Sequence, residues 1–114
     1  SILMHMGGLF KSAKQPGFIH IIINNNAHDS VGGQPTHAFE IDFKKLGYSL
    51  GYDSCHSLTE LKNFRQTMQK ALADKTISTL IEIKVRKGNR ENLGRPKDHP
   101  QTNKEHFIKQ WTSI

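Results

Sequence analysis

An apolar, β-branched run that ends abruptly in three asparagines constrains the fold of this chain more than any other feature. Four isoleucines stand within residues 19–23, and Asn24, Asn25 and Asn26 follow at once. Because the run lacks the alternation of a half-exposed strand, it predicts a buried strand of a parallel sheet over residues 18–24. Ligands of open α/β sheets bind at the carboxyl ends of such strands. The three asparagines therefore occupy a position at which a ligand could bind.

The remaining apolar periodicity predicts helices that alternate with strands. Helical patterns cover residues 2–14, 42–49, 58–74 and 103–111, and two further strands are expected over 52–56 and 76–84. Capping boxes are expected at Ser57–Glu60 and at Thr102–Glu105. This order predicts parallel strands joined by right-handed crossovers. The expected fold class is α/β and doubly wound, with a mostly parallel sheet and helices on both faces, in one domain over residues 1–114.

The asparagine turn has two interpretations. Amide and carbonyl oxygens are hard donors of the kind that Mg²⁺ takes when it also holds phosphate oxygens. Gly32 and Gly33 would let the backbone that follows come close to such a ligand. Asparagines after a strand also tolerate the left-handed conformations of a turn that binds nothing. Residue types alone leave both interpretations open.

Composition bounds the possible partners and the compartment. The length of 114 residues suits one small domain or part of a larger one. The net charge of +6 indicates either an anionic partner or a basic surface that faces solvent. The single cysteine, Cys55, cannot form an internal disulfide, so a cytoplasmic location is expected, with Cys55 as a small core residue. No run is long enough to cross a bilayer and nothing resembles a signal peptide, so no membrane partner is expected.

A basic run follows the last predicted strand. It contains Arg86, Lys87, Arg90, Arg95 and Lys97. Arginine suits phosphate or phosphonate because it forms bidentate hydrogen bonds. A solvated face and a nucleic-acid-binding module are the alternatives, but no aromatic residue interleaves the run as a stacking platform would require. Nucleic acid is therefore not expected as a partner, and charge alone supports that alternative.

The asparagines and the loop that follows them resemble a known motif. The strand ending in Asn24–Asn25, followed by AHDSVGGQPT over residues 27–36, is similar to the second half of the thiamine diphosphate-binding motif. Within the thiamine diphosphate-dependent decarboxylases, the chain looks most like the phosphonopyruvate decarboxylases and next like the sulfopyruvate decarboxylases. The NLGRP segment over residues 92–96 and Asn103–Glu105 add to this resemblance, which covers nearly the whole chain.

The resemblance implies thiamine diphosphate and Mg²⁺ as cofactors. It implies that Asn25 supplies its side-chain oxygen to the metal and Ala27 its backbone carbonyl, while Asn24 bonds the loop or the diphosphate. The expected cofactor-binding residues are Ser1, Asn24, Asn25, Ala27, His28, Ser30, Gly32 and Gly33. The resemblance identifies no catalytic residue in this chain. His28 is a candidate that could equally be a surface histidine or bond the loop.

The Gly-Asp-Gly tripeptide that opens the family's motif is not in this sequence, and its expected place is directly before Ser1. The chain is therefore expected to be the C-terminal part of a diphosphate-binding domain, with an incomplete metal site and no activity alone. The implied reaction of the whole enzyme is decarboxylation of phosphonopyruvate to phosphonoacetaldehyde, with sulfopyruvate or another 2-oxo acid as alternatives. The implied partners are that anionic substrate, a pyrimidine-binding domain from the same or another chain, and further copies in a homo-oligomer.

Overall fold

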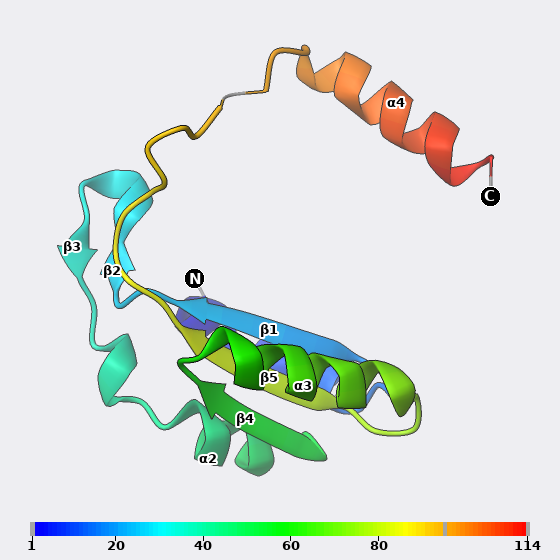
Figure 1. Ribbon diagram of the computed structural model, residues 1–114. Helices are drawn as coiled ribbons and strands as arrows, with labels where there is room; N and C mark the ends of the chain where they lie inside the picture. The colour runs from blue at the N-terminus through cyan, green and yellow to red at the C-terminus, as the bar shows by residue number, and fades with distance from the viewer. Residues whose placement is uncertain (1, 95, 114) are drawn as a thin grey trace.

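Three parallel strands form the centre of the molecule. A computed structural model describes residues 2–94 and 96–113. The strand order is β1 (Ile19–Asn24), β5 (Thr79–Lys84) and β4 (Ser54–Leu58), so β5 lies between the other two (Figure 1). Both pairings are parallel. The carboxyl ends of all three strands therefore meet at one edge of the sheet.

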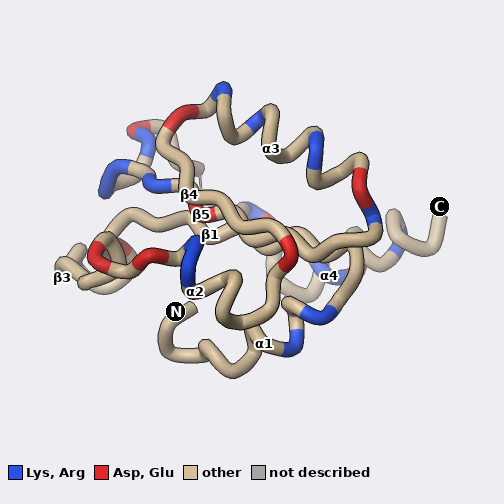
Figure 2. The backbone as a smooth tube through the Cα atoms, turned by 90° about the horizontal axis from the view of Figure 1, so that it is seen from below, with Lys and Arg blue, Asp and Glu red and all other residues tan. Residues whose placement is uncertain are grey.

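Helices cover both faces of this sheet, which confirms the α/β fold class. The helical elements are η1 (Ile2–His5), α1 (Met6–Ala13), η2 (Asp29–Val31), η3 (Ala38–Glu40), α2 (Phe43–Leu50), α3 (Leu61–Ala73) and α4 (Pro100–Trp111). Helix α3 lies on one side of the sheet, and α1 and α2 lie on the other (Figure 2). None of the helices in the described residues combines the length and the apolar character that a membrane span requires.

The core lies between the sheet and the pair α1 and α2. Its buried members are Leu9, Ala13, Ile22, Phe43, Tyr52, Cys55 and Leu80. Gly47 of α2 packs so closely on β4 that a Cβ there would lie 2.6 Å from the Cys55 sulfur. Cys55 is buried as expected of a core residue, and burial raises the pKa of its thiol to about 11. The thiol is therefore neutral at pH 7, which is the poorly nucleophilic form.

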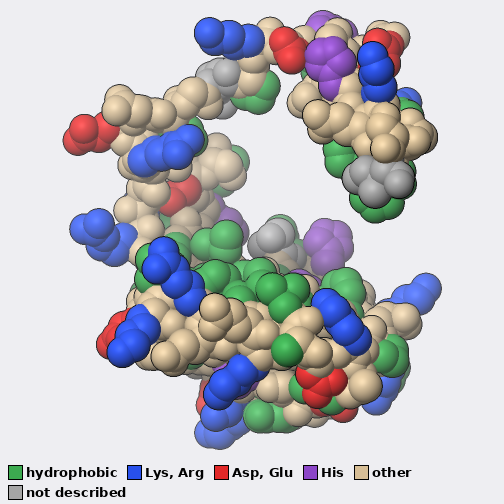
Figure 3. Space-filling view, turned by 45° about the vertical axis from the view of Figure 1, so that its right-hand side comes forward, with side chains coloured by type: hydrophobic (Ala, Val, Ile, Leu, Met, Phe, Trp, Pro, Cys, Tyr) green, Lys and Arg blue, Asp and Glu red, His purple; other side chains and the backbone are tan. Residues whose placement is uncertain are grey.

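Strand β1 is parallel as predicted, but the prediction that it is buried on both faces is wrong. Ile22 is 7% exposed, whereas Ile21 is 40% exposed and Ile23 is 71% exposed. The cause is position, because β1 is an outer strand of the three and α3 leaves its outward side chains open. Figure 3 shows hydrophobic side chains gathered on the surface of the molecule's body.

The expected capping box at the start of α3 is wrong. Strand β4 continues through Leu58, and Ser57 lies inside it. The Ser57 hydroxyl donates to Glu82 rather than to a helix end. Glu60 takes the N-cap position without a side-chain hydrogen bond. The buried Glu82 carboxylate requires a hydrogen-bond donor, and Ser57 serves this carboxylate instead of the helix end that the local pattern predicted.

Helix α4 begins earlier than predicted, and its apolar side chains are exposed. Pro100 opens the helix after His99, so the second expected capping box lies within it. Proline favours the first helical position because its fixed φ suits it. Its apolar residues Phe107 and Trp111 are 67% and 72% exposed. The helix stands apart from the sheet at the end of an extended arm (Figure 1).

Candidate functional site

The edge at which the three strands end gathers the residues that the sequence singled out. Asn25 and Asn26 of the asparagine turn come directly after β1. The basic segment 84–87 starts at Lys84, the last residue of β5, and continues beyond that strand. A short antiparallel pair, β2 (Ala27–His28) and β3 (Gln34–Pro35), extends the asparagine turn into a hairpin-like loop. Parallel strands place these segments together although they are about 60 residues apart in the chain.

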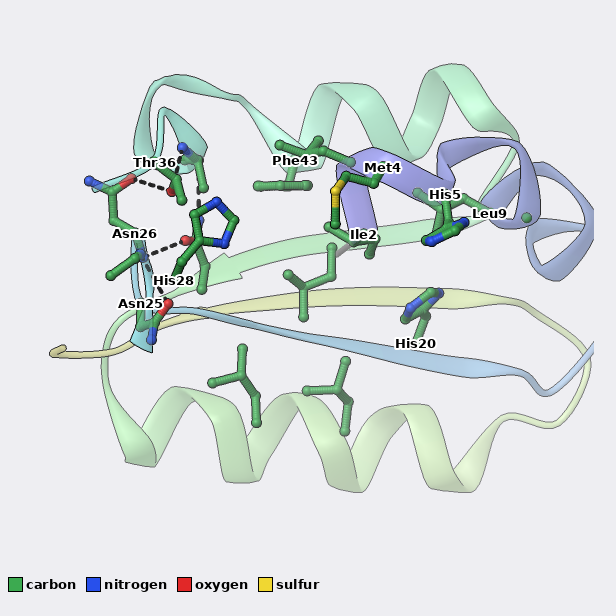
Figure 4. Close-up of a pocket in the computed structure, with 18 of the residues that line it drawn as sticks. Ile2, Met4, His5, Leu9, His20, Asn25, Asn26, His28, Thr36 and Phe43 are labelled. Carbon is green, nitrogen blue, oxygen red and sulfur yellow. Dashed lines mark hydrogen bonds between the residues drawn. The ribbon is translucent and has the colours of Figure 1, made fainter. Parts of the chain in front are cut away.

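A groove of about 800 Å³ lies between the first helical turn and the asparagine turn. Ile2 and Met4 line its middle, and Asn25 and His28 line one end (Figure 4). Its walls are mostly apolar, with amide and carbonyl groups concentrated at the end where β1 stops. This combination of an apolar body and a few polar groups is typical of a small-molecule site.

Asn24 points into the protein and holds the loop. Its Nδ2 donates to Glu82 Oε1 at 2.6 Å and to the Ala38 carbonyl at 3.2 Å. Its Oδ1 accepts from the backbone N–H of Asn26 at 3.1 Å. The side chain is 5% exposed, so both amide hydrogens are used within the chain. Asn24 was expected to bond either the loop or the diphosphate, and these contacts are hydrogen bonds to the loop.

Glu82 is a buried carboxylate that the sequence analysis missed. It stands in the central strand, is 1% exposed, and accepts hydrogen bonds from Asn24 on one side and Ser57 on the other. One carboxylate thus joins side chains from all three strands. The available signal was a single acid inside the apolar run of residues 79–85. Buried carboxylates require such donors, because burial without them is strongly unfavourable.

Asn25 is oriented by its neighbours on both sides. Its Nδ2 donates to Asp29 Oδ2 at 2.7 Å, and its Oδ1 accepts from the Ala27 N–H at 3.1 Å. An amide oxygen has two lone pairs, so this oxygen retains one for a cation. In the β2–β3 pair, Ala27 lies opposite Pro35, and the flanking hydrogen bond runs from the Thr36 N–H to the Asn26 carbonyl. Ala27 and Pro35 are therefore a non-hydrogen-bonded pair, which leaves the Ala27 carbonyl directed away from β3. This donor set fits a hard cation such as Mg²⁺.

The described residues contain no group of three or more His, Cys, Asp and Glu side chains that could hold a metal ion. A cation at this edge would therefore depend on amide and carbonyl oxygens from this chain. The two oxygens of Asn25 and Ala27 do not complete an octahedral shell, which Mg²⁺ ordinarily fills with water, carboxylate or phosphate oxygens.

Asn26 and the two loop glycines adopt left-handed conformations. Asn26 has a φ of 54°, and its Oδ1 accepts from Thr36 Oγ1 and from the Phe39 N–H. Gly32 and Gly33 have φ values of 97° and 71°. The turn interpretation applies to Asn26, and the Oδ1 atoms of Asn24 and Asn25 also accept from an N–H two residues further on, as in an Asx turn. Their Nδ2 groups, in contrast, donate to the carboxylates of Glu82 and Asp29, and a simple turn does not require these contacts.

His28 and Ser30 lie in the same loop with exposed side chains. The His28 ring lies at the asparagine end of the groove, beside Thr36 (Figure 4). The neighbouring Asp29 carboxylate accepts from Asn25 and from the Gly88 N–H, so it does not orient the imidazole as a catalytic triad would require. Ser1 and Arg95 lie outside the residues that the structure describes.

Two histidines that the sequence analysis did not single out lie at the other end of the groove. His5 and His20 face each other there (Figure 4). His20 Nδ1 lies 2.9 Å from the Tyr52 hydroxyl, and burial lowers its pKa. A neutral ring at this position extends the apolar wall rather than adding a charge to it.

Two curated proteins match most of this chain. The phosphonopyruvate decarboxylase of Streptomyces viridochromogenes is 35% identical over 102 residues, which make up 88% of this chain and 25% of that protein. The phosphonopyruvate decarboxylase of Streptomyces hygroscopicus is 36% identical over 102 residues, with the same shares. The matched part of this chain is similar to these phosphonopyruvate decarboxylases. This confirms the resemblance, although the chain spans only about a quarter of the length of these relatives. No family model matches the chain.

Proposed function

We propose that this chain is the diphosphate- and metal-holding part of a thiamine diphosphate-dependent decarboxylase that acts on phosphonopyruvate. The observation that carries the proposal is the geometry of Asn25 and Ala27. Their oxygens lie where the parallel strands end, in a chain that matches two proteins named phosphonopyruvate decarboxylase.

In this proposal, Asn25 Oδ1 and the Ala27 carbonyl hold Mg²⁺, and Asp29 orients Asn25 by accepting from its Nδ2. The buried hydrogen bond from Asn24 to Glu82 anchors the turn to the central strand of the sheet. Gly32 and Gly33 give the loop the left-handed conformations that let it fold back along the groove. When bound, thiamine diphosphate supplies the electron sink that a 2-oxo acid needs to lose carbon dioxide.

The groove has the size and polarity for a cofactor of this kind. Its volume is about 800 Å³, and its polar end coincides with the two proposed metal ligands. His28 stands at that end with an exposed ring and would donate to a bound anion. The proposal assigns the remaining metal ligand and the carboxylate that activates the cofactor to parts of the protein other than this chain, the latter to a pyrimidine-binding domain. This chain alone would not turn over substrate.

The experiment uses the full-length protein and calorimetry with thiamine diphosphate and Mg²⁺. Asn25→Ala is expected to weaken Mg²⁺-dependent cofactor binding at least about tenfold, because it removes a charge-assisted contact to the metal. Asn63→Ala is the matched control, since Asn63 is an exposed residue of α3. Equal affinity of the Asn25→Ala variant and the unaltered protein would contradict the metal assignment.

The substrate is tested separately, by the rate of carbon dioxide release. Phosphonopyruvate is expected to turn over faster than sulfopyruvate and pyruvate in the full-length protein. Faster turnover of sulfopyruvate would shift the proposal to the sulfopyruvate decarboxylases and leave the metal site unaffected.

A further inference from the structure

A second hollow lies on the other side of the asparagine turn. It has a volume of about 630 Å³, and Asn25, Asn26 and Ala27 line both it and the larger groove. The turn therefore forms a wall between two cavities. The charged residues that line the second hollow are Lys84, Arg86 and Lys87, with no acid among its lining residues.

Among the described residues, these three cations have no acidic partner. In the part of the chain that the structure describes, none of them lies within 4.0 Å of a carboxylate oxygen. The Lys84 ammonium lies 5.5 Å from the centre of the Phe39 ring, and the Lys87 ammonium donates to the Gly33 carbonyl. These neutral partners position the cations without neutralising them. A cleft lined by charges of one sign concentrates counter-ions of the opposite sign.

The hollow is built by contacts between two distant segments. Asp29 Oδ2 accepts both from Asn25 Nδ2 and from the Gly88 N–H, which ties the segment after β5 to the loop after β1. Lys87 reaches across the same junction to Gly33. The cations therefore stand on backbone that is fixed on both sides of the hollow.

We propose that this hollow binds a tetrahedral dianion, the phosphate or phosphonate group of a small molecule. Arg86 can offer a bidentate pair of N–H donors, and Lys84 supplies a point charge at the same wall. Resting on the proposed function, the substrate's phosphonate is one source of this group, because phosphonopyruvate carries a second anionic end beyond its keto acid. Free phosphate is the other source.

The site is tested by calorimetry of the full-length protein with methylphosphonate and with inorganic phosphate, neither of which requires any decarboxylase activity. Both ligands are expected to bind, and Arg86→Gln and Lys84→Gln are each expected to weaken binding about tenfold. Arg65→Gln, an exposed residue of α3, is the control and should leave affinity unchanged. Unchanged affinity in Arg86→Gln, or no binding by the unaltered protein, would overturn the proposal. Matching thermal unfolding of the variants shows that each has folded.

The source of the anion is tested by kinetics in the same protein. If the substrate's phosphonate occupies the hollow, inorganic phosphate inhibits competitively and Arg86→Gln raises KM for phosphonopyruvate but not for pyruvate. If free phosphate is the ligand, it binds with the same affinity in the presence of saturating phosphonopyruvate. Both results support an anion site, and they assign it to different sources. An absence of all decarboxylation would reject the proposed function but leave the binding result standing.

Discussion

The loop after β1 and the arm after β5 leave the same edge of the sheet, but only the loop is held by the protein's interior. Residues 24–40 are fixed by the buried Asn24 side chain and by hydrogen bonds that meet at the Asn26 oxygen. In the described part of the arm beyond Gly88, no hydrogen bond reaches the sheet or its helices. The two regions have similar contents of Gly, Pro and polar residues. A polar segment thus takes a defined shape where a buried group in the sheet supplies its hydrogen-bond partners.

The largest expected effect is on the anchor beneath the loop. Asn24→Ala removes the donor to Glu82 and leaves a buried carboxylate with one partner fewer. The free energy of unfolding is expected to fall by about 3 kcal/mol, measured by chemical denaturation. Asn92→Ala in the arm is the matched control, because Asn92 is exposed, and it should change stability by less than about 0.5 kcal/mol. Equal losses in the two variants would show that the loop and the arm do not differ as described.

A smaller effect is expected from a pair of glycines, one in each region. Gly33→Ala places a Cβ at a φ of 71° and within 2.6 Å of the Lys87 side chain, so stability should fall by about 1–2 kcal/mol. At Gly94 in the arm, no described residue other than its chain neighbours has an atom within 4 Å of the position of an added Cβ. Gly94→Ala should therefore change stability by less than about 0.5 kcal/mol. Thermal unfolding of both variants measures the difference, and a larger loss for Gly94→Ala would reverse the comparison.

The smallest effect is expected from pH, and it arises in the packed body. Burial lowers the pKa of His20 and of His56 below 6.5 in the folded protein. The unfolded chain therefore takes up protons first, so stability is full above pH 6.5 and falls as pH decreases toward the lowered pKa values. His20→Gln should reduce this dependence between pH 7 and pH 5 and leave the part that is due to His56. An unchanged pH dependence in His20→Gln would show that His20 protonates equally in both states.

The sequence by itself determined the three strands of the central sheet and the position of the asparagines at the end of β1, although it did not predict the short pair β2 and β3. β-branched runs predicted β1 and β5 within two or three residues, and Asn24–Asn26 were expected at the carboxyl end of β1, where they are. Strand formation depends on local backbone preference and on the spacing of apolar residues, and both can be read from the sequence. The buried position of Cys55 was predicted from its residue type, because a lone cysteine behaves as a small apolar residue.

Only the tertiary structure decided which of these segments are covered and which polar groups meet. The outward side chains of β1 are open because of strand order, and Ser57 bonds Glu82 instead of capping α3 because the two strands pair. The hollow beside Lys84 and Arg86 likewise requires the ends of β1 and β5 to lie together. Such contacts join residues tens of positions apart, and their energies depend on burial and geometry that no local pattern carries.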